Sequence, residues 1–147
     1  YQSLDWHLAE KPPHEGVQKW VRELNRLART EPSLHEVDFS SDGFEWIDLH
    51  DRDASVISFL RKARNPADSI LVVCNFTPAT RLGYRVGAPK AGTYRLLFNS
   101  DAKEYGGSGV GAGELEARPE PQTLQSRPFS IPVDLPPLAA IAYRVPR

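Results

Sequence analysis

The hydrophobic positions near the start of the chain follow a helical period. Five apolar residues recur three or four positions apart, with most charged residues between them: Val17, Trp20, Val21, Leu24 and Leu27. This spacing predicts one amphipathic helix over about residues 14–30, after an irregular lead-in. Pro32 ends the helix, because proline lacks the next backbone donor and disfavours helical geometry at the residue before it.

Beyond Pro32 the helical period disappears and short strand patterns take its place. Seven segments are predicted as strands: 44–49, 55–61, 69–76, 83–88, 93–99, 129–135 and 138–145. The continuous apolar run 69–76 is typical of a strand buried on both faces. Pro132 predicts that its strand lies at a sheet edge or carries a bulge, and 118–127 reads as a polar spacer. Together these patterns predict a mainly β chain, an antiparallel β-sandwich preceded by one helix.

Composition narrows the function classes. The 147 residues suit one domain, or one domain with an appendage, and 18 basic against 19 acidic residues give a formal net charge of −1. This balance provides no basic footprint for nucleic acid or an anionic membrane. A single cysteine rules out an internal disulfide, and neither a signal peptide nor a membrane-spanning run is visible. We therefore expect a cytoplasmic protein.

The glycine-rich stretch 105–114, "YGGSGVGAGE", fits no functional loop. A dinucleotide fingerprint fails because Ala112 occupies the position of the third glycine, and the Lys-Ser or Lys-Thr of a phosphate-binding loop is missing. A nucleophile elbow around Ser108 fails because Val110 replaces its second glycine. We expect this stretch only to turn the chain between strands.

No catalytic or metal-binding constellation emerges from the remaining polar residues. The four histidines are scattered without zinc-like spacing, so neither a metal nor another cofactor is expected. Asp48 and Asp51 are close enough in sequence for a carboxylate pair, but acids on a strand and its turn are more often solvated. Cys74 lies in the most apolar segment and reads as a small buried hydrophobe. We assign no catalytic residue.

Aromatic residues are the candidates for binding, because flat rings stack on sugars as well as on core neighbours. Trp20 lies on the helical apolar stripe and is expected to pack, and Trp46 is expected in the core of its strand. Trp6, in the irregular lead-in, has no evident packing role. If the chain binds sugar, the candidates are Trp6, Trp46 and Tyr105.

Taken in order, nine pieces of the chain resemble the C-terminal end of bacterial 1,4-α-glucan (glycogen) branching enzymes, members of the α-amylase superfamily. The pieces are "SLDWHL", "GVQKWVRELNRL", "EPSLHEVDF", "GFEWID", "SVISFLR", "VVCNFTP", "GYRVGAP", "FNSDAKEYGGSG" and "LPPLAAIAYR". They cover essentially the whole chain, and their collinear order is specific although single pieces are not.

The resemblance implies that residues 1–31 form the tail of a catalytic (β/α)8 barrel, and that 32–147 form the all-β C-terminal domain. It implies glycogen synthesis by retaining transglycosylation, with an aspartate nucleophile, a glutamate acid/base and a stabilising aspartate. In the family these three residues precede the region matched here, so this chain alone is expected to be inactive. Expected partners are α-1,4-glucan or glycogen through the parent enzyme, the upstream barrel, and a second copy through the helical stripe.

Two other readings stay open. The first is an independent carbohydrate-binding module that uses exposed aromatics such as Trp6, Trp46, Tyr84 or Tyr105. The second is a plain interaction domain of immunoglobulin-like shape, although the Cys…Trp…Cys spacing of such domains is absent.

Overall fold

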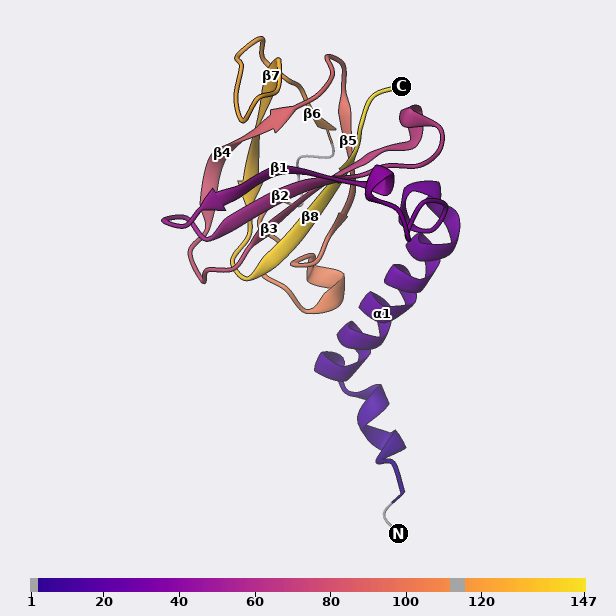
Figure 1. The fold of residues 1–147 in the computed structure, drawn as a ribbon. Helices are drawn as coiled ribbons and strands as arrows, with labels where there is room; N and C mark the ends of the chain where they lie inside the picture. Colours follow the sequence, from indigo (N-terminus) through magenta and orange to yellow (C-terminus); the bar gives the residue numbers. More distant parts are fainter. Residues whose placement is uncertain (1–2, 112–115) are drawn as a thin grey trace.

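The computed structural model describes residues 3–111 and 116–147, which form a β-sandwich with one long helix beside it (Figure 1). The helices are η1 (Trp6–Glu10), α1 (Pro12–Thr30), η2 (Pro32–Leu34), η3 (Ser41–Gly43), η4 (Pro66–Asp68) and η5 (Lys103–Tyr105). The strands are β1 (Phe44–Asp51), β2 (Val56–Arg61), β3 (Ile70–Asn75), β4 (Arg81–Ala88), β5 (Tyr94–Asn99), β6 (Glu116–Ala117), β7 (Phe129–Leu135) and β8 (Ala139–Arg144). The predicted fold class, mainly β and antiparallel with one helix, is confirmed.

The strands form two antiparallel sheets. The larger sheet has the order β1-β2-β3-β8-β5-β6, and β4 pairs with β7 in the smaller one. Apolar side chains of both sheets fill the space between them, among them Leu71, Val73, Val86 and Ile131, all fully buried. Alternation along each strand places these residues on the inner faces.

The larger sheet is apolar on its outer face as well. Ile70 and Val72 of β3 form a second cluster with Ala142 of β8, and Leu34 and Phe98 pack against them. The prediction that this segment is buried on both faces is therefore confirmed. A strand with two covered faces reads as a continuous apolar run, which explains its sequence.

Three differences from the expected elements have simple physical causes. Helix α1 begins at Pro12, earlier than predicted, because a first-turn residue does not need its backbone N–H. The short strand β6 and the backbone pairing of Glu120 with Ser130 were not predicted. Each is too short to show an alternation of apolar and polar side chains, so the sequence pattern does not predict it. Pro132 lies in β7, a strand of the two-stranded sheet, so the edge position is confirmed.

Trp46 corrects the expectation that it lies in the core. Its side chain is 45% exposed, whereas its neighbour Ile47 is 7% exposed and belongs to the inner core. Apolar residues occupy both faces of β1, so alternation alone could not decide which face points inward. The strand turns Ile47 inward and leaves Phe44 and Trp46 on the outer face.

A hydrogen bond between a tyrosine and a carboxylate connects the two sheets. The Tyr84 hydroxyl on β4 donates to Asp51 Oδ2 on β1 at 2.6 Å, and the Ala54 amide donates to Asp51 Oδ1 at 2.9 Å. The hydrogen bond from Tyr84 is the largest cause that holds the pKa of Asp51 below its ordinary value.

Replacing Tyr84 by phenylalanine should lower the free energy of unfolding at neutral pH by about 1–2 kcal/mol, because the carboxylate loses a donor. A lowered folded-state pKa contributes stability that is complete above the unfolded value of about 3.9 and disappears as the pH falls through the folded value. In urea unfolding, the difference in unfolding free energy between parent and variant should therefore shrink as the pH falls from about 5 to about 2, the range in which carboxylates become protonated. A difference that stays constant with pH would contradict this role.

Candidate functional site

The glycine-rich loop after β5 folds around a carboxylate of its own. Asp101 accepts hydrogen bonds from the Ser108 amide at 2.9 Å, from the Ser108 hydroxyl and from the Val110 amide at 3.3 Å. Gly106 and Gly109 adopt positive φ values of 90° and 79°, which glycine reaches without steric cost. The loop amides are directed at Asp101, so the predicted turn is confirmed for residues 105–111, whereas residues 112–114 of that stretch lie outside the described part of the chain.

The same loop holds helix α1 against the sandwich. The Trp20 ring lies 5.1 Å from the Tyr105 ring and 5.4 Å from the Phe98 ring, measured between centroids. Gly16, one turn earlier, is buried so closely that a Cβ there would lie 2.5 Å from the Tyr105 carbonyl oxygen. The predicted packing role of Trp20 is confirmed. Burial is the largest cause that raises the pKa of Tyr105 to about 12.

The flank of α1 beside this contact remains exposed. Val17, Val21 and Leu24 are 59%, 49% and 40% exposed and repeat at helical spacing; we call them the helix stripe. The face that carries Gly16 and Trp20 meets the sandwich, so only this half of the predicted apolar surface lacks cover. Three large aliphatic side chains in one row on a helix are typical of a contact surface.

Three aromatic rings gather on the outer face of the larger sheet. Trp46 contacts Phe44 at 4.8 Å and Phe59 at 5.8 Å, in each case edge to face, and Phe44 stacks on Phe59 at 5.1 Å. We call these residues the aromatic patch. Two edge contacts fix the orientation of the Trp46 ring, and its exposed side stays accessible.

The three aromatic candidates for sugar binding lie apart. Trp6 is 74% exposed in η1, which lies at the end of α1 that extends away from the sheets (Figure 1). Tyr105 is half-buried against Trp20, whereas Trp46 belongs to the aromatic patch on β1. In the part of the chain that the structure describes, no ring contact joins any two of these three side chains.

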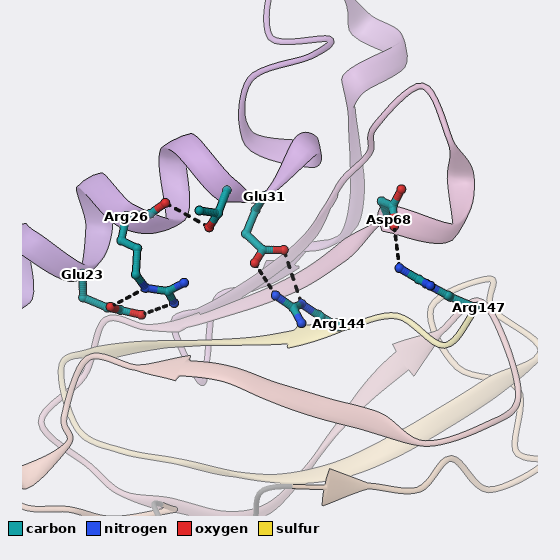
Figure 2. A network of polar contacts seen from close by, with 7 residues as sticks. Glu23, Arg26, Glu31, Asp68, Arg144 and Arg147 are labelled. Carbon is teal, nitrogen blue, oxygen red and sulfur yellow. Dashed lines mark hydrogen bonds and ion pairs between the residues drawn. The ribbon is translucent and has the colours of Figure 1, made fainter.

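A hollow of about 690 Å³ opens where α1 ends against the sheet. Its walls come from residues 30–32, 67–70, 93, 95 and 144–147, and we call it the polar pocket. At its inner end Glu31, only 7% exposed, accepts from Arg144 Nε at 3.3 Å and from Arg144 Nη2 (Figure 2). At its rim Arg147 Nη2 lies 3.6 Å from Asp68 Oδ1.

The acidic residues that could suggest catalysis are committed elsewhere. Asp48 accepts from the His50 amide at 2.8 Å and from Gln125 Nε2 at 2.8 Å. The pKa of Asp51 is lowered, first by the bond from Tyr84, whereas a general acid needs a raised one. Burial raises the pKa of the half-buried Cys74 thiol, which disfavours the nucleophilic thiolate.

Within residues 3–111 and 116–147, a metal centre would require clustered ligand side chains and a membrane span would require a long apolar helix. No three histidine, cysteine, aspartate or glutamate side chains there cluster closely enough to hold a metal ion. None of the helices described has the length and apolar character needed to cross a bilayer.

Comparison with known families decides the fold assignment. The family described as "Alpha amylase, C-terminal all-beta domain" matches residues 46–146, most of the chain and all of its strands except the start of β1. The chain belongs to this family. Its all-β domain accounts for both sheets, while α1 lies before the matched region.

Curated relatives extend the match over α1. The chain is 55% identical over 140 residues to the 1,4-alpha-glucan branching enzyme GlgB of Aquifex aeolicus, covering 95% of the chain and 22% of that enzyme. It is 53% identical to the protein of the same name from Rubrobacter xylanophilus, covering 96% and 19%. The corresponding protein of Synechocystis sp. is 43% identical, covering 97% and 18%. The chain thus spans about a fifth of the length of these relatives.

The polar pocket, which lies between the helix end and the sheet, is a feature that the sequence did not reveal. Its walls come from four separate segments, and its arginines carry no motif. The register does pair Arg95 with Arg144 directly across β5 and β8, but only a known strand order brings these two positions together.

Proposed function

We propose that this chain is the C-terminal region of a 1,4-α-glucan branching enzyme of glycogen synthesis, in which residues 1–31 complete a catalytic barrel and 32–147 form its all-β domain. The observation that carries the proposal is the 43–55% identity to branching enzymes over nearly the whole chain, α1 included. The proposed setting is the cytoplasm, where an enzyme of polymer storage would meet its glucan.

The proposed role of the chain within that enzyme is support. Val17, Val21 and Leu24 are exposed beside the sandwich contact, and burying the remaining surface of side chains of this size against a barrel contributes up to about 1.5 kcal/mol each. The adjoining helix face is fixed by Trp20 and Gly16, so the sandwich would set the position of the helix stripe. When no barrel is present, the helix stripe would favour association with a second copy.

Direct glucan contact is the finer part of the proposal. Among Trp6, Trp46 and Tyr105, Trp46 has the most suitable surroundings, because its ring is exposed and held in place by Phe44 and Phe59. The same aromatic patch favours the second candidate function, an independent carbohydrate-binding module. The two differ in what α1 does, since a module has no use for an exposed helix stripe.

An activity assay of the chain alone tests the proposal that it lacks the reaction centre. Retaining transglycosylation needs two carboxylates about 5–5.5 Å apart, one as nucleophile and one as acid/base. Asp48 and Asp51, the nearest candidates, are bound by Gln125 and Tyr84. Incubation with amylose should leave the iodine–glucan absorbance unchanged. A fall in that absorbance produced by the chain alone would overturn this assignment.

A further inference from the structure

The polar pocket combines a sufficient volume with unused hydrogen-bonding capacity. Its volume of about 690 Å³ falls within the 300–1,000 Å³ typical of small-ligand sites. Arg144 donates hydrogen bonds from Nε and Nη2 to the buried Glu31, yet its side chain is 57% exposed. A guanidinium has five N–H groups, so Arg144 keeps donors for a ligand while the carboxylate behind it fixes the position of its plane.

The rim adds groups of both kinds. Arg147 and Asp68 lie 3.6 Å apart, too far for a hydrogen bond, and Arg147 is 86% exposed. Arg95 on β5 pairs with Arg144 on β8. Its Nε lies 3.5 Å from Glu116 Oε1. Hydrogen-bond donors and acceptors therefore surround one hollow, and some of their N–H groups and oxygens remain available to a ligand. Pro32 and Pro146 also line the hollow.

We propose that the polar pocket is a glucan-binding site, distinct from the aromatic patch, that takes a short α-1,4-linked glucose segment. Each sugar hydroxyl donates and accepts, which suits a wall that offers guanidinium N–H groups and carboxylate oxygens together. A phosphate would meet the arginines but also face Glu31 and Asp68, and an apolar ligand would leave the charges desolvated and unpaired. The choice of glucose polymer, as opposed to another neutral sugar, rests on the proposed function.

The location of the pocket gives the site a purpose within the proposed enzyme. It lies where the last turn of α1 reaches β3 and β8, so one wall belongs to the helix and the others to the sandwich. Glu31, which precedes Pro32, links the two walls through Arg144 (Figure 2). A glucan segment bound here would hold the polymer at the junction between the helix and the all-β domain, away from the aromatic patch.

Titration of the 147-residue chain with maltoheptaose, followed by amide NMR, tests the site. We expect shifts at Ser69, Ile70, Thr93 and Val145, which line the pocket, with a dissociation constant weakened about tenfold by Arg147→Gln or Arg144→Lys. Arg144→Lys retains a cation beside Glu31, and thermal unfolding checks that both variants are folded. Arg52→Gln is the matched control, because Arg52 lies in the β1–β2 turn at the opposite end of the sheet.

Each outcome bears on the proposal. Shifts confined to the aromatic patch, variants that bind maltoheptaose as tightly as the parent, or inorganic phosphate that shifts the pocket amides where maltoheptaose does not would each overturn it. The branching assay is independent of this readout. If the chain restored branching activity in place of the matching part of a branching enzyme but did not bind maltoheptaose, the site alone would be refuted. If it bound maltoheptaose in the pocket but restored no activity there, the proposed function would be refuted.

Discussion

Replacing Arg144 by methionine should lower the free energy of unfolding by about 2–3 kcal/mol, because it leaves a buried carboxylate without its partner. Glu31 is only 7% exposed and both of its oxygens accept from Arg144. Because the Arg144 side chain is 57% exposed, we expect a smaller loss of stability than on breaking a fully buried ion pair. Urea unfolding at neutral pH measures the effect.

Two further variants distinguish the cost of leaving the Glu31 carboxylate unpaired from the cost of losing an arginine side chain. Arg147→Met removes an arginine from the same pocket, but one that is 86% exposed, and should leave stability unchanged. Adding Glu31→Gln to Arg144→Met removes the unpaired charge and should recover part of the loss. If Arg144→Met and Arg147→Met were equally stable, Glu31 and Arg144 would not hold the helix end to the sheet.

Replacing Gly16 by alanine should destabilise the chain by about 1–3 kcal/mol through overpacking. In an ordinary helix interior the same change is stabilising by about 1 kcal/mol, because alanine is the better helix former. Here a Cβ would lie 2.5 Å from the Tyr105 carbonyl oxygen, and that backbone belongs to a loop fixed around Asp101. The helix can accept the methyl group only by moving away from the loop.

The control for Gly16→Ala is Asn25→Ala, an exposed position of the same helix where the change removes only an unfavourable propensity. We expect Asn25→Ala to be neutral or slightly stabilising in urea unfolding. Hydrogen exchange should locate the damage caused by Gly16→Ala in α1 and η5 and spare the larger sheet. A Gly16→Ala variant as stable as Asn25→Ala would show that the helix does not need this close approach.

Much of this fold follows from local pattern. The period of α1, the apolar run of β3 and the proline of β7 each have one dominant physical cause that the sequence displays. The position of Trp46 does not follow, because β1 is apolar on both faces and its inward face depends on what packs there. The larger sheet has two covered sides, so alternation identifies the strand and leaves its orientation open.

The candidate site is less accessible to sequence reasoning than the fold. Trp6, Trp46 and Tyr105 could be picked out as aromatic, but their separation and the burial of Tyr105 against Trp20 depend on tertiary packing. The polar pocket requires the ends of α1 and β8 to meet beside β3 and β5. The local sequence of these segments does not indicate that they lie together in the fold.

A chimera provides the most direct measurement of the central claim, in which this chain replaces the matching 22% of the Aquifex aeolicus branching enzyme. Loss of iodine–amylose absorbance should show branching by the chimera and none by the chain alone. Val21→Asp with Leu24→Asp should reduce that activity at least about tenfold, since burying two unpaired charges costs several kcal/mol. Arg22→Asp, which changes the net charge equally at an exposed polar position, should not. Full activity with both aspartates on the helix stripe would contradict the account.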